Sequence, residues 1–525
     1  MNNIFNKINK IFSYKFKYKK GNIGILISDR GRVDSNFRTI ISASIINDLY
    51  GANTFVLTDR KNYDKLNGDL FKLYNIKKIY SSPLIFISTN LVIYIKTVLE
   101  IILFIIKIIN KKNKLYWFIS QYNYLNIKVG DLIYDQYIRN DLSFIKPKIF
   151  SLKFLKVFFD GIYKILIIDK NVKKHNIKLI ISNQKAYTSV GNLLLRYGTK
   201  NNLITMLTGY NFIKFYTNYE ESLYHPFKVS NYLLKQIKNY KQKKIEKFYY
   251  DRIASKVKVS YVDPKLIKKL YTNYKNNNFT KFIKSLKKNG YKTVNVFALH
   301  AFSDCSHAFG NLIFNDYYDQ FVSTIRFLKK HEKNKNAFWL IKPHPARRTY
   351  NEENIVESIL KKYNVKNVKI CPSNINNNVL FNNIDNLITT ASTVGLEYAC
   401  TGKKPILSGL APYYKKNLFH RITSRQGYFR MLENIHFFEN KISKKDTNIC
   451  KRILFVMENL VNFNLIKSSI LSSDTQRHYK GFESYINLLF KNCQKLRIIS
   501  LYYDEFYQDL KKKIKNNINL NKIKL

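Results

Sequence analysis

Short apolar runs alternate with segments of helical periodicity along most of the chain, and this alternation predicts an α/β fold. Ile23–Ser28 is an apolar run, Phe37–Tyr50 is amphipathic and ends at Gly51, and Thr54–Thr58 is apolar again. This order predicts a βαβ unit that opens a Rossmann-like half. The same pattern returns further on, with strands expected at 178–182 and 203–207 and a helix at 189–197. The first loop contains no G-x-G-x-x-G, so the dinucleotide fingerprint is absent.

A second set of strands and helices follows residue 290. A long helix is expected at 317–331, and strands are expected at 293–299, 338–341, 368–370, 387–388 and 405–407. Residues 226–290 are rich in Lys and Tyr and carry few strand signals, which favours a helical connector. The predicted organisation is a leader (1–20), a first Rossmann-like domain (21–225), the connector (226–290), a second Rossmann-like domain (291–445) and a C-terminal helical segment (446–525).

Two loops in the second half carry the strongest chemical signal. Phe338–Ile341 runs into Lys342-Pro343-His344-Pro345, and Leu387-Ile388 runs into Thr389–Glu397. Buried parallel strands deliver such loops to the carboxyl edge of a sheet, where open α/β sheets bind ligands. The two prolines hold the imidazole in one direction. The arrangement suits a nucleotide, because Ser392 and Thr393 at a helix start can bind its phosphate and Glu397 can bind its ribose hydroxyls.

The net charge of +55 is the exceptional feature of the composition. It follows either from the abundance of Lys, Asn, Ile, Tyr and Phe, or from an anionic partner such as a membrane face. No nucleic-acid-binding module is recognisable, so no nucleic-acid partner is expected. The five cysteines form no C-x-x-C pair, which favours a reducing cytosol and no metal site.

Two segments bear on membrane contact. Met1–Lys20 has six lysines and no acid, and Ile4, Phe5, Ile8, Ile11 and Phe12 share a helical face, as in a basic amphipathic leader. Leu84–Asn110 is strongly apolar, and Lys96, Glu100 and Lys107 lie within roughly 40° of one another on a helix. That stripe disfavours a membrane span. A buried helix with one wet edge is the favoured interpretation, ahead of a helix in the membrane interface.

Several stretches resemble the bacterial capsule polysaccharide biosynthesis proteins. They are Lys342–Pro345, Ser392–Glu397, Val129–Asp135, His300–His307 and Phe314–Asp319, which together span roughly residues 125–430. These proteins are glycosyltransferases of the GT-B architecture, and the capsule β-Kdo transferases are among them. The resemblance implies two Rossmann-like domains facing a cleft, with the acceptor on the first and the nucleotide-sugar on the second. Tyr413-Tyr414-Lys415-Lys416 stands where the Kdo transferases have a glycine- and tryptophan-rich segment, so the donor sugar is left open.

Donor-binding and catalytic roles are expected of two residue sets. The candidates for donor binding are Lys342, His344, Pro345, Arg347, Ser392, Thr393, Glu397 and Ser408. Arg348 and Tyr413 are weaker candidates. A transferase that inverts the anomeric centre needs a general base. Asp304 is the first choice for the base, Asp34 is its rival, and His300 and His307 follow, with Asp131 and Asp135 after them.

The predicted function is transfer of a sugar from a nucleotide-activated donor to a capsule or other surface glycan, or to a lipid-linked acceptor. The donor is a substrate, and no metal or other cofactor is expected. The protein is expected in the cytoplasm, peripheral to the inner membrane, at its anionic cytosolic face. One alternative is a polyol-phosphate transferase of the CDP-glycerol type. The other is a non-catalytic basic scaffold.

Overall fold

The computed structural model of the protein describes residues 21–29, 33–59, 71, 74–81, 90–140, 142–208, 213–224, 234, 240–254, 277–308, 312–372, 375–415, 417–460, 491 and 505–518. Two compact units emerge from it. Unit 1 comprises residues 1–137, 148–224 and 459–525, and unit 2 comprises residues 138–147 and 225–458. The predicted leader, residues 1–20, lies outside the described residues.

Unit 1 is built on a six-stranded sheet in the order β3-β2-β1-β6-β7-β8. All neighbours are parallel except β7 and β8, which are antiparallel. The strands are β1 (Ile23–Ser28), β2 (Ala52–Thr58), β3 (Lys77–Tyr80), β6 (Ile177–Ser182), β7 (Ile204–Thr208) and β8 (Ile213–Tyr216). Taken in chain order this is 3-2-1-4-5-6, the doubly wound Rossmann order.

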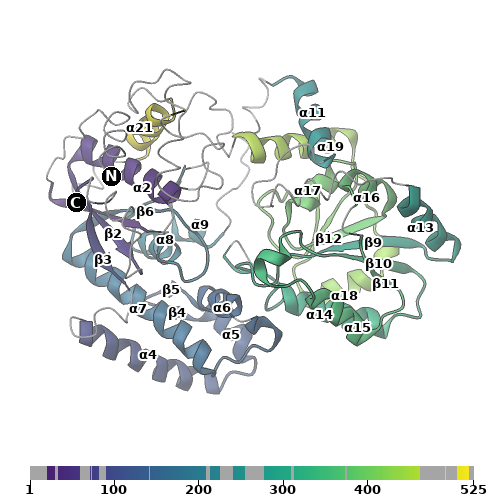
Figure 1. The fold of residues 1–525 in the computed structure, drawn as a ribbon, viewed down its shortest axis with the longest axis horizontal. Coiled ribbons are helices and arrows are strands. Elements are labelled where there is room, and N and C mark those ends of the chain that lie inside the picture. Colours follow the sequence, from purple (N-terminus) through teal and green to yellow (C-terminus); the bar gives the residue numbers. More distant parts are fainter. Residues whose placement is uncertain are drawn as a thin grey trace. The chain divides into compact units, whose positions relative to one another are not determined.

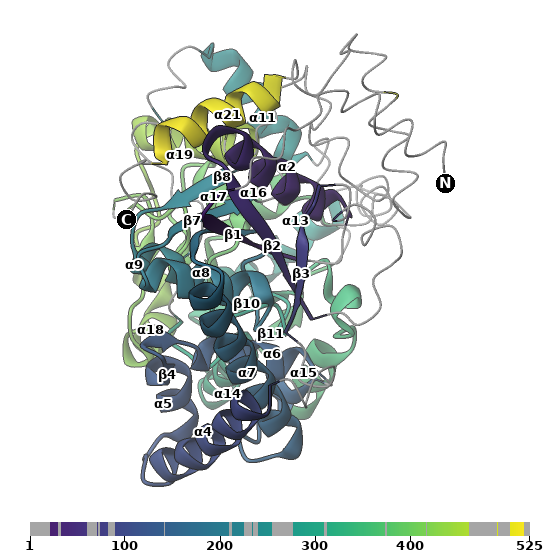
Figure 2. The ribbon, with the colours of Figure 1, turned by 90° about the vertical axis from the view of Figure 1, so that its left-hand side faces the viewer.

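Helices cover this sheet with segments from distant parts of the sequence (Figures 1 and 2). On one face, α2 (Val33–Tyr50) and α21 (Glu505–Asn517) close a core that contains Ile25, Ile27, Phe37, Tyr507 and Ile514. The predicted C-terminal segment (446–525) is therefore divided, because α21 belongs to unit 1 whereas residues up to Glu458 belong to unit 2. The remaining helices of the unit are α4 (Leu91–Ile109), α5 (Lys114–Gln121), α6 (Gly130–Arg139), α7 (Leu152–Lys174), α8 (Val190–Lys200) and α9 (Tyr219–Leu223). A small hairpin joins β4 (Asn123–Tyr124) to β5 (Ile127–Lys128).

Unit 2 repeats the topology with a fully parallel sheet in the order β11-β10-β9-β12-β13-β14. The strands are β9 (Thr293–Ala298), β10 (Ala337–Lys342), β11 (Val368–Ile370), β12 (Asn386–Thr389), β13 (Ile406–Leu407) and β14 (His420–Arg421). The chain order is again 3-2-1-4-5-6. Strand order reverses between β9 and β12, so the loops after these two strands start side by side.

The helices of unit 2 include two from the predicted connector. They are α11 (Gln242–Ile253), α13 (Asn277–Lys288), α14 (Tyr317–Lys330), α15 (Ile355–Tyr363), α16 (Asn377–Asn383), α17 (Thr393–Ala399), α18 (Arg425–Glu433) and α19 (Lys444–Phe455). Tyr249 and Ile253 of α11 and Phe279 and Ile283 of α13 are buried in the unit 2 core. Their apolar faces thus complete this core rather than bridging two domains as a separate connector.

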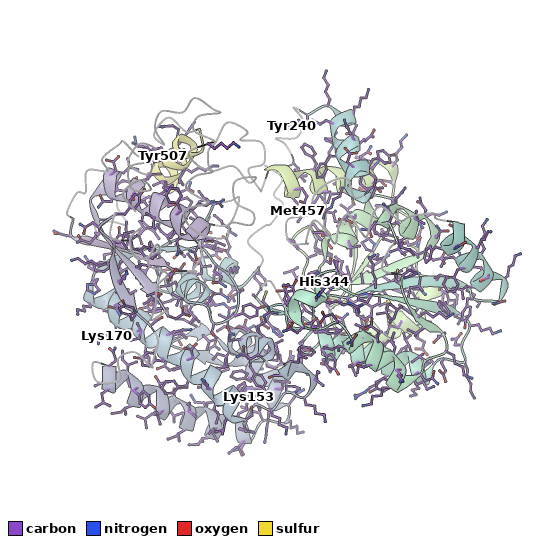
Figure 3. All side chains as sticks on the ribbon, in the orientation of Figure 1. Lys153, Lys170, Tyr240, His344, Met457 and Tyr507 are labelled. Carbon is purple, nitrogen blue, oxygen red and sulfur yellow. The ribbon has the colours of Figure 1, made fainter. Side chains whose placement is uncertain are left out.

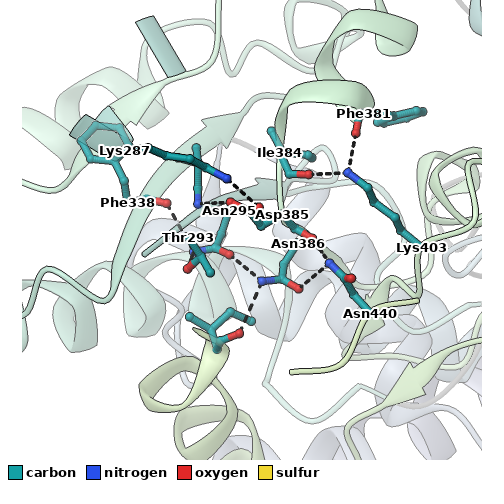
Figure 4. A network of polar contacts seen from close by, with 12 residues as sticks. Lys287, Thr293, Asn295, Phe338, Phe381, Ile384, Asp385, Asn386, Lys403 and Asn440 are labelled. Carbon is teal, nitrogen blue, oxygen red and sulfur yellow. Dashed lines mark hydrogen bonds and ion pairs between the residues drawn. The ribbon is translucent and has the colours of Figure 1, made fainter. Parts of the chain in front are cut away.

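A polar network ties the amino-terminal ends of β9 and β12 together (Figure 4). Asn386 Nδ2 donates to Asn295 Oδ1 at 2.9 Å, and both side chains are buried. The carboxylate of Asp385 accepts from the Val294 backbone N–H at 2.8 Å and from Lys287 Nζ at 2.9 Å. Buried amides that satisfy each other fix the register of the two strands. Because this network lies at the end of the strands away from the predicted ligand edge, its role is structural.

The predicted α/β class and most predicted strands are confirmed. The prediction for the apolar segment 84–110, of which residues 90–110 are described, differs from the structure. The segment forms α4, and Lys96 and Lys107 are exposed as expected, but the prediction of a buried helix with one charged edge is wrong in two respects. Glu100 is buried, whereas Leu99, Ile102 and Ile106 are exposed. Among the described residues, no helix has the length and apolarity needed to cross a membrane.

Candidate active site

The carboxyl edge of the unit 2 sheet brings together the loops that the sequence singled out. The loop after β9 begins at Leu299 and contains His300, and the loop after β10 contains His344, labelled in Figure 3. The loop after β12 leads into α17. In doubly wound sheets, ligands bind at this edge where the strand order reverses. The edge is therefore the candidate active site.

Two histidines from different loops are stacked at this edge. The rings of His300 and His344 are parallel within 8°, with centroids 6.5 Å apart. His300 also stacks on Tyr317, with the two ring centroids 4.5 Å apart. The backbone N–H of Ala391, in the loop after β12, points to His300 Nε2 at 3.4 Å. His300 thus connects three loops.

Both imidazoles are neutral at physiological pH. Burial, reinforced by the neighbouring His344, lowers the pKa of His300 to about 3. Burial also lowers the pKa of His344, against the opposing effect of Asp304. The Ala346 N–H donates to His344 Nδ1 at 3.3 Å, which assigns the proton of the neutral ring to Nε2. His344 therefore presents an N–H donor, while His300 is too weak a base to deprotonate a hydroxyl near pH 7.

Asp304 lies beside these rings, on a loop held by a buried carboxylate. Glu352 accepts hydrogen bonds from the backbone N–H groups of Phe302 and Ser303, each at 2.8 Å. These bonds fix the turn that presents Asp304. Burial and the neighbouring Asp304 carboxylate raise the pKa of Tyr350, so the Tyr350 hydroxyl lies near Asp304. Asp304 is half-buried, so part of its carboxylate is accessible to an acceptor hydroxyl.

The cationic candidates near His344 divide into two kinds. Lys342 ends β10 and is half-buried at the sheet edge. Arg347 is bound to Glu357 at 2.7 Å, and Arg348 lies 3.6 Å from Glu353 with 86% of its side chain exposed. Pro345 is exposed in the turn between Lys342 and Arg347. Since both arginines have carboxylate partners, Lys342 is the remaining cation of this set at the described edge.

The hydroxyl candidates lie at the start of α17 and in the loop after β13. Ser392 is the N-cap of α17, and Thr393 is its first residue, both half-buried. Ser408 is buried and accepts from Gln320 Nε2 at 2.7 Å. Gln320 Oε1 in turn accepts from the Thr390 hydroxyl at 3.0 Å. Ser408 therefore fixes the loops after β12 and β13 through Gln320.

Glu397 is engaged on the protein side of α17. Its carboxylate accepts from Arg252 Nε and from Asn377 Nδ2, each at 2.8 Å, and only 4% of the residue is exposed. The reason for expecting a ribose partner was that a buried carboxylate needs one. Arg252 and Asn377 already supply it.

The remaining candidates lie in unit 1, in the loop after β9 and in the loop after β13. Asp34 belongs to the first turn of α2 in unit 1, and its side chain lies outside the described part. His307 is 7% exposed, and Asp135 is fully buried in α6. Asp131 forms a buried bidentate pair with Arg196 at 2.7 and 3.0 Å, a structural role. The Tyr413 hydroxyl donates to the Ser392 carbonyl and so holds the loop that leads into α17.

Three residues of this edge had no role assigned from sequence. Tyr317 stacks on His300, Gln320 joins two loops, and Tyr350 lies near Asp304. Tyr317 lies within the Phe314–Asp319 stretch that resembled the capsule proteins, so that motif was the available signal. Gln320 sits one helical turn further on the same helix. Within the described ranges, no group of three or more His, Cys, Asp and Glu is placed to hold a metal ion.

Comparison with protein families identifies residues 211–419 as a match to the family described as capsule polysaccharide biosynthesis protein. The match contains His300, Asp304, His344 and the β12–α17 loop, and it confirms the resemblance stated from the motifs. Val129–Asp135 lies outside the matched residues. Among curated proteins, none is similar enough to count as a match.

Solved structures give remote likenesses. A glycosyltransferase from Rickettsia africae is 11% identical, with 92% of this chain and 99% of that chain covered and a TM-score of 0.24. The β-Kdo 2,4 transferase KpsC of Thermosulfurimonas dismutans is 11% identical over 52% of this chain and 79% of that one, with a TM-score of 0.29. Anabaena HepE, in complex with UDP and glucose, is 10% identical over 90% and 99%, with a TM-score of 0.25. At these scores they carry no argument about function.

Proposed function

Because the chain matches the capsule polysaccharide biosynthesis family over residues 211–419, we propose that it is a glycosyltransferase. It moves a sugar from a nucleotide-activated donor to a surface polysaccharide or a lipid-linked acceptor. The observation that carries the proposal is the meeting of His300, His344 and Asp304 where the strand order of unit 2 reverses, inside the matched residues.

Each group has a defined task in this proposal. His344, neutral with its proton on Nε2, donates to a phosphate oxygen of the donor, and Lys342 adds positive charge at the same edge. These contacts stabilise the charge that develops on the leaving nucleotide. Asp304 removes the proton of the acceptor hydroxyl as it attacks the anomeric carbon. His300 orients the loops through Tyr317 and Ala391 and does not act as the base.

The nucleotide-sugar is a substrate, and the proposal assigns no metal or other cofactor. The reaction is placed in the cytoplasm, at the anionic face of the inner membrane, where a lipid-linked acceptor is within reach. Supporting this location are the net charge of +55 and the lysine-rich segment Met1–Lys20. Each lysine near an anionic leaflet contributes on the order of 1 kcal/mol.

Thermal unfolding in the presence of CMP-, UDP-, GDP- and TDP-sugars tests the donor site. A cognate ligand at a hundredfold excess over its Kd stabilises the protein by about 2.7 kcal/mol. We expect one nucleotide class to raise the Tm of the wild type and to have a smaller effect on His344→Ala. His331→Ala is the matched control, because His331 caps the far end of α14. If no nucleotide shifts the Tm of the wild type, the donor-site proposal is wrong.

Analysis of the product separates the two transfer reactions. A glycoside carries no phosphorus from the donor, whereas a polyol-phosphate transferase leaves a phosphodiester in the product. Mass spectrometry of the extended acceptor therefore distinguishes them. A scaffold without catalysis predicts no product and full function of His344→Ala.

A further inference from the structure

Helix α4 presents an apolar face that no described part of the chain covers. Ten of its large apolar side chains are between 36% and 64% exposed. They are Leu91, Val92, Tyr94, Ile95, Val98, Leu99, Ile102, Leu103, Ile106 and Ile109. Soluble monomers rarely expose so many contiguous apolar side chains, and such a surface marks an interaction site.

The opposite side of α4 anchors it to unit 1. Ile93, Thr97, Glu100, Phe104 and Ile108 are buried, and α4 lies along α7 in both views (Figures 1 and 2). Phe104 packs on an aromatic cluster that includes Phe118, Tyr122, Phe154 and Phe158. At 100° per residue, the exposed apolar positions occupy about half of the helix circumference, opposite this anchor. One half of the helix circumference therefore packs on unit 1, and the other half is exposed to solvent.

The exposed charges within residues 91–128 have one sign. Glu100 is the only acidic residue from 91 to 128, and it is turned inward, where Tyr122 OH donates to it at 2.8 Å. Lys96 and Lys107 lie on the helix circumference at one border of the apolar face, and both are exposed. Lys111 and Lys112 follow the helix and are exposed as well. The apolar face is thus bordered by cations without an exposed acid in this stretch.

Aromatic side chains extend the surface at the carboxyl end of α4. Trp117 lies 5.3 Å beneath the Lys111 ammonium, and Phe150 lies 5.6 Å beneath that of Lys114. Phe150 is 45% exposed, and its neighbour Leu152 is 86% exposed. Aromatic rings with cationic neighbours are typical of the boundary between lipid headgroups and acyl chains.

We propose that α4 is a membrane-docking helix that lies parallel to the surface of an anionic bilayer. Its exposed apolar face enters the region between headgroups and acyl chains, and the bordering lysines extend to the anionic headgroups. Charge complementarity favours this occupant over a second copy of the chain. A twofold dimer across this face would bring the same lysine border against itself. The attachment goes beyond the proposed transfer reaction and does not depend on it.

Co-sedimentation of the full chain with vesicles tests the proposal. We compare neutral phosphatidylcholine vesicles with vesicles in which 30% of the lipid is phosphatidylglycerol, in low salt and in 1 M NaCl. The variant Leu99→Ser/Ile102→Ser/Ile106→Ser changes only exposed positions, so its fold should persist, which circular dichroism checks. The matched control is Tyr250→Ser/Phe437→Ser, at two residues of unit 2 that are 58% and 75% exposed.

We expect the α4 variant to lose at least tenfold in partitioning to anionic vesicles, and the control to stay within twofold of wild type. Part of the wild-type binding should survive 1 M NaCl, because apolar insertion is not screened. Nitroxide-labelled lipids should quench Trp117, since the second tryptophan, Trp339, is buried. Unchanged partitioning of the α4 variant overturns the proposal. A wild-type dimer in solution that the α4 variant dissociates, without vesicle binding, overturns it in favour of a second copy.

Discussion

Replacing Glu397 by alanine tests whether its carboxylate is structural or binds the donor. The change removes the partner of Arg252, whose Nε lies 2.8 Å from Glu397 Oε1. Only 4% and 6% of the two side chains are exposed, so water cannot replace the lost partner. Asn377 loses its acceptor at the same time.

The expected loss of stability follows from that burial. Breaking a buried ion pair by removing one partner costs about 3–5 kcal/mol, because the other charge is left uncompensated. A second carboxylate, that of Glu458, lies 3.8 Å from Arg252 Nη2 and is 28% exposed, so it compensates only in part. For a domain of 150–250 residues, 1 kcal/mol corresponds to about 2–4 °C in Tm. We therefore expect Glu397→Ala to lower the Tm of unit 2 by roughly 6–20 °C.

Two further variants isolate the cause. Arg252→Met/Glu397→Gln removes both charges and should lose clearly less stability than Glu397→Ala, because no buried charge is left alone. Glu353→Ala breaks the exposed pair with Arg348 and should change stability by at most about 1 kcal/mol.

The assay is thermal unfolding followed by circular dichroism, with nucleotide binding measured well below the transition. A Glu397→Ala protein that melts within about 2 °C of wild type, yet binds the nucleotide more than tenfold more weakly, would refute the structural assignment. It would instead restore the ribose contact expected from the sequence.

Three other predictions concern the edge of the unit 2 sheet. Asp304→Asn should lower kcat by roughly 10²–10⁴ with little change in donor Kd, measured by steady-state kinetics and calorimetry; a kcat within threefold of wild type would exclude it as the base. His344→Ala should weaken donor binding and lower kcat together, because the phosphate contact acts in both the ground state and the transition state; an effect on neither would remove it from the site. For His300, whose folded pKa is about 3 against an ordinary value of 6.5, the unfolded chain binds more protons between those values, so stability should rise with pH from about 3 to 6.5 and then level off. Tm measured from pH 4.5 to 8 should show a shallower slope for His300→Asn, and an identical slope would contradict the neutral assignment.

The sequence by itself determined the local elements and the loops that carry chemistry. Apolar runs such as Ile23–Ser28 and Phe338–Ile341 appear in the structure within strands β1 and β10, because a parallel strand covered on both faces buries nearly all of its side chains. The placement of His344 and His300 directly after such runs was enough to bring them to one sheet edge, since parallel strands share a direction. The α/β class followed from the same periodicity.

Tertiary structure alone decided which partners the polar side chains contact and which helix faces remain exposed. Glu397 had the right spacing for a ligand contact, but Arg252, 145 positions earlier in the sequence, occupies it. Glu100 marked the expected wet side of α4, yet its bond to Tyr122 turns it inward and leaves Ile102 and Ile106 outside. Periodicity states which residues share a face of a helix. Which face is buried depends on contacts between residues distant in sequence, and those exist only after the chain has folded.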